Sequence, residues 1–173
     1  KNYLWLITGW EIMSISSYLI IGINKMVKGP AFIFMLFSEI STASLIISAI
    51  ITFSISGSFF LEAPVIPVIY LLISLGAFIK MGMFPFMIAE WLPIAHGSAP
   101  ANASAIFSAT MTLMGVFLIY KMTLFITYDI YFQYIGLFFL ITGAISLFFG
   151  SIYAYISENS KMLAGFSTIE NQG

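Results

Sequence analysis

The sequence contains no cysteine and no arginine, and its one histidine is His96. Without cysteine the chain can hold no disulfide, thiolate metal site, iron–sulfur ligand or cysteine nucleophile. A single histidine cannot form a metal centre, so we expect no cofactor in this chain. Any redox centre, such as iron–sulfur clusters, nickel–iron or flavin, would then belong to partner subunits.

Charge is also scarce. Charged residues make up 8% of the 173 residues, with a net charge of −1, while 61% are hydrophobic; an average soluble domain has about 25% charged residues. No basic run is present, so nothing indicates nucleic acid as a partner. The composition indicates a multi-pass protein of the cell membrane, with the lipid bilayer as its surroundings.

Long apolar runs are what the sequence has in abundance. A hydrocarbon core about 30 Å thick needs roughly 20 helical residues to cross it, and these runs are too long and too uniformly apolar for barrel strands. We therefore expect an all-α, polytopic transmembrane helix bundle. It forms a single domain over residues 1–173, as a fragment of a longer protein. The expected spans are residues 3–23, 31–54, 64–88, 101–126 and 133–157, with a sixth beginning at 161.

Lys80 lies well inside the third expected span. An intramembrane lysine is a functional candidate by default, because it must face a partner or a hydrated cavity. Pro85 lacks an N–H and its ring would clash with the carbonyl of Met81, while Gly82 permits local unwinding. We therefore expect a broken helix at Gly82 and Pro85, as at the ion sites of transporters. The alternative is an ordinary kink with a snorkelling lysine, which the depth of Lys80 disfavours.

Glu11 and Glu39 lie inside the first two expected spans, where a carboxylate facing lipid would cost roughly 2.5–3.5 kcal/mol. Both are expected to face protein. Glu11 shares a helix face with Ser14 and Tyr18, and we expect it to partner Lys80. A nearby carboxylate favours a charged lysine and burial disfavours it, so a movable Glu11–Lys80 pair can load and release a proton. The competing interpretation is a static ion pair that fixes helix register.

Three further features leave alternatives open. Glu39 either extends a proton relay or pairs structurally. His96, in the expected loop WLPIAHGSAP, either relays protons or makes a helix-end hydrogen bond. A hydroxyl seam in the fourth span either allows close helix packing or forms a wetted proton path; it comprises Ser104, Ser108, Thr112 and Gly115. No phosphate loop, nucleophile elbow or paired metal ligands are present.

Three segments carry a family resemblance. They are WEIMSISSYLI around Glu11, KMGMFPF with EWLPIAHGSAPANASAIFSATMTLMGVF from Lys80 onward, and SENSKMLAGFSTIEN around Lys161. Together they resemble the proton-conducting, antiporter-like membrane subunits shared by respiratory complex I, energy-converting membrane-bound hydrogenases and multi-subunit cation/proton antiporters. The IEN ending resembles the hydrogenase and formate hydrogenlyase subunits most.

The resemblance implies about fourteen spans in two inverted five-helix repeats, of which this fragment holds most of the first. It places the family's glutamate on Glu11 and its broken-helix lysine on Lys80, and it adds Lys161 to the candidate proton-translocation residues. Three positions depart from the family pattern: Met87 stands for a common histidine, Leu113 for a second lysine and Asn159 for an aspartate.

We therefore expect a proton-translocating membrane subunit of a complex I-like or energy-converting hydrogenase complex. Electron transfer in its partner subunits would drive proton movement through the Glu11–Lys80 pair, with no catalytic redox site in this chain. Two alternatives stay open, a secondary sodium/proton antiporter subunit and a scaffold subunit that keeps the fold without conducting.

Overall fold

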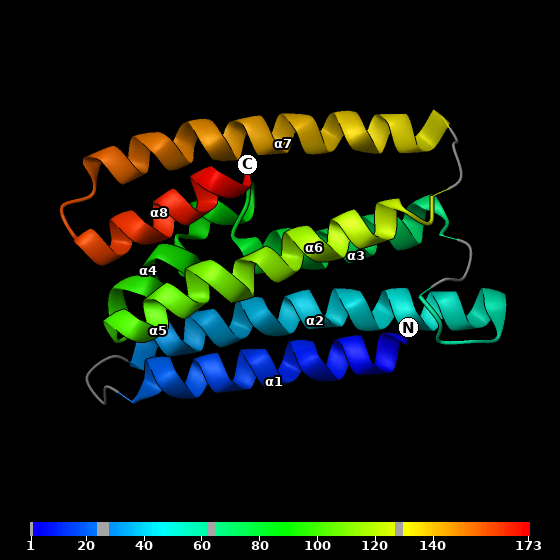
Figure 1. Ribbon diagram of the computed structural model, residues 1–173, viewed down its shortest axis with the longest axis horizontal. Helices are drawn as coiled ribbons and strands as arrows, with labels where there is room; N and C mark the ends of the chain where they lie inside the picture. Colours follow the sequence, from blue (N-terminus) through cyan, green and yellow to red (C-terminus); the bar gives the residue numbers. More distant parts are fainter. Residues whose placement is uncertain (1, 24–27, 62–64, 127–129) are drawn as a thin grey trace.

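The computed structural model describes residues 2–23, 28–61, 65–126 and 130–173, and Figure 1 shows their helices running roughly along one axis. Within these residues the expectation of an all-helical bundle is confirmed, and five segments are long and apolar enough to cross a membrane. The elements are α1 (Tyr3–Gly22), α2 (Lys28–Ser56), α3 (Pro67–Met81), the 3-10 helix η1 (Phe86–Ala89), α4 (Trp91–Ser98), α5 (Ala101–Ile106), the π-helix η2 (Phe107–Met111), α6 (Thr112–Thr123), α7 (Ile130–Ile156) and α8 (Ser160–Gln172).

The helix ends lie close to the expected ones, and local chemistry sets several of them. The α8 N-cap is Asn159, whose Oδ1 accepts a hydrogen bond from the backbone N–H of Lys161 at 3.0 Å. Pro67 begins α3, where its missing N–H costs nothing. The expected start of this third span, residue 64, lies outside the described residues.

The largest difference from expectation is α4, because we expected residues 91–100 to form a loop. Pro93 lies in the first turn of α4, a position where proline leaves no hydrogen bond unmade. Figure 1 shows α4 beside α8, below α7. The close approach of α8 depends on Gly165, where an added Cβ would lie 2.6 Å from the Cα of Pro93.

Hydrogen bonds through a serine hydroxyl connect α1, α2 and α3. The indole Nε1 of Trp10 donates to Ser41 Oγ at 3.1 Å, and that hydroxyl donates to the carbonyl of Gly76 at 2.7 Å. A Cβ at Gly76 would lie 2.9 Å from the Ser41 carbonyl oxygen. Glycine at this position lets the two helices approach closely, as small residues do in membrane bundles.

The expected break in the third span lies between α3 and α4. Gly82 has φ 68°, the N–H of Met83 bonds the carbonyl of Phe78 at 3.1 Å, and the N–H of Gly82 bonds that of Ile79 at 3.1 Å. This is a Schellman motif, in which a left-handed glycine ends a helix. The expected clash between Pro85 and the Met81 carbonyl is wrong, because the helix has already ended before the proline, which follows a cis peptide bond.

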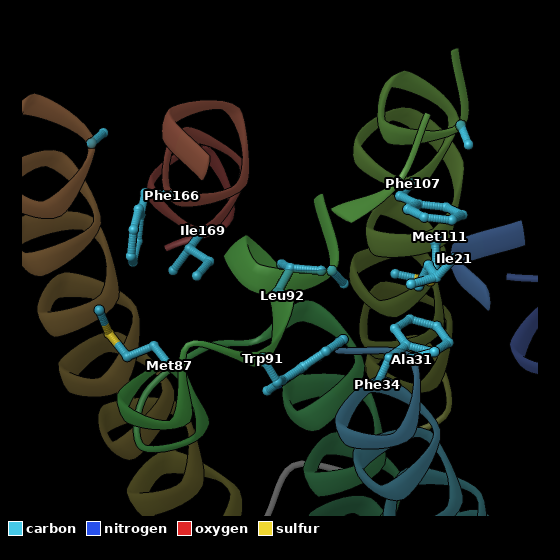
Figure 2. Packing of buried hydrophobic residues seen from close by; sticks show 14 residues of the cluster. Ile21, Ala31, Phe34, Met87, Trp91, Leu92, Phe107, Met111, Phe166 and Ile169 are labelled. Carbon is cyan, nitrogen blue, oxygen red and sulfur yellow. The ribbon is translucent and has the colours of Figure 1, made fainter. Parts of the chain in front are cut away.

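The second half of the broken helix is fixed by aromatic packing. Figure 2 shows Trp91 beside Phe34 of α2, with Phe166 and Ile169 of α8 on the other side of α4. The Trp91 ring lies 5.8 Å from the Phe34 ring and stacks on Phe37 at 5.7 Å. These contacts hold the start of α4 against α2, close to the residues that surround Lys80.

Candidate functional site

Lys80 has no solvent exposure and is among the largest fully buried side chains. Its ammonium donates to Ser14 Oγ at 2.5 Å and to Ser38 Oγ at 3.2 Å. The serines come from α1 and α2, so three helices meet at one nitrogen. These hydroxyls satisfy two of the three ammonium donors, which identifies a built site rather than a lysine snorkelling to the membrane surface.

Two further features stabilise positive charge at this site. The Lys80 ammonium lies 5.8 Å from the Trp10 ring centroid and 5.6 Å from that of Phe34, within range of cation–π attraction. Lys80 is also in the last turn of α3, where the helix dipole favours a cation. α3 ends at Met81, one residue after Lys80.

The two predicted acidic residues are near Lys80 without pairing to it. Glu11 and Glu39 both act electrostatically on the ammonium, yet neither forms an ion pair with it within the described part of the chain. Glu11 is half-buried, and its Oε1 is enclosed without a hydrogen-bond partner there. Glu39 is exposed within the described residues, because the buried face of α2 passes through Ser38, one residue away, and the expectation that it faces protein stays a prediction.

Ser14 is the α1 side chain that bonds the ammonium. It lies one turn after Glu11 on α1, is fully buried and donates its own proton to the Trp10 carbonyl at 2.8 Å. Its oxygen is thus free to accept from Lys80. Tyr18, the third member of the expected polar stripe, is 38% exposed and does not take part.

His96 is fully buried in α4 rather than placed in a loop. Its Nδ1 shares a 2.7 Å hydrogen bond with Ser104 Oγ, and its Nε2 is buried without a partner in the described residues. The ring also packs edge-on against Phe107. The bond to Ser104 joins α4 to α5, as one of the two alternatives expects, and a relay role for His96 stays a prediction.

The hydroxyl seam of the fourth span is bonded to protein along its length. Ser108 bonds Thr168 of α8 at 2.8 Å, and Thr112 donates to the Ser108 carbonyl at 2.7 Å. Gly115 packs on α3, where an added Cβ would lie 2.7 Å from Met81 Cγ. These contacts favour the interpretation of the seam as a packing surface, with Ser108 placed in the π-helix η2.

Lys161 lies apart from Lys80, at the start of α8. Its Nζ donates to the carbonyl of Ala99 at 2.9 Å, just after the end of α4. An unpaired helix-end carbonyl is therefore satisfied by a cation.

Met87 and Leu113, two of the departures from the family pattern, differ in position: Met87 is buried in the core, while Leu113 is 55% exposed.

One residue of the site escaped sequence reasoning. Ser38 was missed although Ser38, Ser41, Thr42 and Ser48 recur at helical spacing on one face of α2. No group of three or more possible metal ligands occurs among the residues that the structure describes.

These features define a multi-pass membrane protein with a charged residue at a helix break. The family model described as NADH:quinone oxidoreductase/Mrp antiporter, TM, matches residues 1–173, and the chain belongs to this family. The chain is 30% identical over 188 residues to hydrogenase-4 component B of Escherichia coli (strain K12). This alignment covers 99% of this chain and 27% of that protein.

A solved structure also matches. A chain in the structure of the Mrp complex from Dietzia sp. DQ12-45-1b shares the fold with a TM-score of 0.82, at 22% identity, over 99% of this chain and 20% of that one. The present chain therefore spans about a quarter of the length of the proteins it matches.

Proposed function

We propose that this chain is part of a proton-translocating membrane subunit in which Lys80 carries the proton. The observation that supports this most is the fully buried Lys80 ammonium, bonded to hydroxyls from two other helices at the end of a broken helix. A hydroxyl can accept from the ammonium and can also donate to the neutral amine. The surroundings of Lys80 can therefore accommodate both protonation states.

The absence of a direct ion pair in the described residues argues against a static register-fixing pair. Glu11 instead acts on Lys80 electrostatically, without an ion pair in the described residues, and one of its carboxyl oxygens is enclosed and has no hydrogen-bond partner there. In our proposal, movement of Glu11 toward Lys80 stabilises the charged form, and its withdrawal favours proton release. Glu39, His96 and Lys161 are the proposed residues of the onward relay.

The proposed complex is complex I-like or an energy-converting hydrogenase, in which partner subunits carry the redox centres, including iron–sulfur clusters and nickel–iron or flavin. The match to hydrogenase-4 component B supports it. A secondary sodium/proton antiporter subunit is the second candidate, because the chain also shares the fold of the Mrp complex. Sodium-dependent transport in vesicles without an electron donor would favour this second candidate.

The test is Lys80→Met in the full-length protein within its intact complex, reconstituted in vesicles. Methionine keeps much of the side-chain length and removes the proton-carrying nitrogen. We expect proton pumping to be lost while much of the electron transfer remains, and Glu11→Gln to weaken pumping in the same direction. Undiminished pumping in Lys80→Met would refute the proposal and favour a non-conducting scaffold subunit.

A further inference from the structure

Among the described residues, one acidic side chain, that of Glu170, hydrogen-bonds to another helix. Its Oε1 lies 2.9 Å from Ser151 Oγ of α7. The two helices touch here because Gly150 has no side chain: a Cβ would lie 2.9 Å from Glu170 N and 3.0 Å from its Cα. Gly150 thus admits the backbone of α8, and Ser151 bonds the carboxyl group beside it.

The Ser151 hydroxyl has two acceptors within reach and a single proton. Its Oγ lies 2.8 Å from the Leu147 carbonyl oxygen and 2.9 Å from Glu170 Oε1. When Glu170 is ionised, the hydroxyl donates to the carboxylate. When Glu170 is protonated, its O–H donates to Ser151 Oγ and the hydroxyl turns to Leu147. Both protonation states are hydrogen-bonded without movement of any heavy atom.

Among the described residues, no fixed counter-ion selects one of these states. Within Ile130–Ile156, α7 has no Asp, Glu, Lys or Arg, and η2 has no titratable side chain. On α4 the titratable groups are His96, bonded to Ser104, and Glu90 at its start. On α8 itself, the titratable Lys161 bonds the Ala99 carbonyl. On α7, the nearby Tyr153 stacks on Phe166. The described residues give Glu170 no ion pair.

We propose that Glu170, with Ser151, is a further proton-binding site of this protein. A proton delivered from water as hydronium binds Oε1, the carboxylate becomes a carboxylic acid, and the Ser151 proton turns to the Leu147 carbonyl. The reverse movement returns the proton to water. This inference rests on the proposed function for the role of the bound proton, whereas the binding itself can be measured separately.

The experiment is infrared difference spectroscopy of the full-length protein in its complex, titrated with acid in lipid. Protonation of a carboxylate creates a carboxylic-acid carbonyl band. We expect a pH-dependent band that disappears in Glu170→Gln and shifts in Ser151→Ala, because Ser151→Ala keeps the carboxyl group and removes its partner. The matched control is Glu158→Gln, an exposed glutamate before α8, which leaves the band unchanged.

A spectrum that is the same in the wild type and in Glu170→Gln would overturn the proposal. A band that follows sodium concentration and not pH would also overturn it, in favour of a sodium site. Lys80→Met separates the two proposals. Normal pumping in Lys80→Met with the Glu170 band present refutes only the proposed function, and lost pumping with no band refutes only the Glu170 site.

Discussion

Removing the Ser146 hydroxyl tests how the helix break is held. Ser146 of α7 is fully buried; its Oγ accepts from the N–H of Phe84 at 2.8 Å and donates to the Thr142 carbonyl at 2.7 Å. A buried N–H left unpaired costs about 1–3 kcal/mol, whereas hydrogen bonds within membrane bundles average about 0.6 kcal/mol. Phe84 lies outside any helix, and among the described residues its N–H has no other acceptor. We therefore expect Ser146→Ala to lower the free energy of unfolding by about 1–2 kcal/mol.

The assay is reversible unfolding of the full-length protein in mixed micelles, followed by a helix-sensitive signal. Thr142→Val is the matched control, because its hydroxyl is equally buried on α7 and bonds only the Phe138 and Phe139 carbonyls of its own helix, each at 3.0 Å. We expect this control to cost less than about 0.5 kcal/mol. Equal losses in the two variants would show that the bond to Phe84 contributes nothing, and would refute the reasoning.

Two further predictions concern the ends of the broken helix. Gly82→Ala should destabilise the protein by about 1–2 kcal/mol for the left-handed backbone, plus the cost of a Cβ placed 3.1 Å from Leu92 Cβ. Gly57→Ala, with φ 67° and open space around it, should show the first cost alone, and equal losses would exclude the Leu92 contact. Lys161→Met should remove the bond to the Ala99 carbonyl, lower the free energy of unfolding by about 1 kcal/mol and slow proton transport in vesicles; a normal transport rate would remove Lys161 from the relay.

The fold was largely predictable because the membrane limits the choices. A backbone in hydrocarbon must satisfy its own hydrogen bonds, so apolar runs of roughly 20 residues become helices whatever their neighbours. The break could be placed for a similar reason, since Gly82 and Pro85 disfavour a continuous helix. Helix α4 was not predicted, because Pro93 and Gly97 are typical of loops. Only the packing of α8 against these two residues explains why a helix forms there.

The partners of the charged residues were harder to predict. Opposite charges attract over several ångströms, so Glu11 was a reasonable choice for Lys80, but charge alone does not state which side chains bond the ammonium directly. Serine is common in membrane helices as a packing residue, and nothing in the sequence distinguishes Ser38, which bonds the ammonium, from Ser48, which bonds its own helix.

The same ambiguity explains why Glu170 could not be recognised as a site. Its pairing with Ser151 depends on which turn of α7 carries a glycine, and Gly150 is one of three glycines within that helix. Only the packing of α8 shows that this glycine and the adjacent hydroxyl meet the same carboxyl group. Lys80 and Glu170 thus share a design: an ionisable group bonded to serine hydroxyls instead of an opposite charge. A hydroxyl accepts or donates according to the protonation of its partner, and a salt bridge would favour only one of the two states.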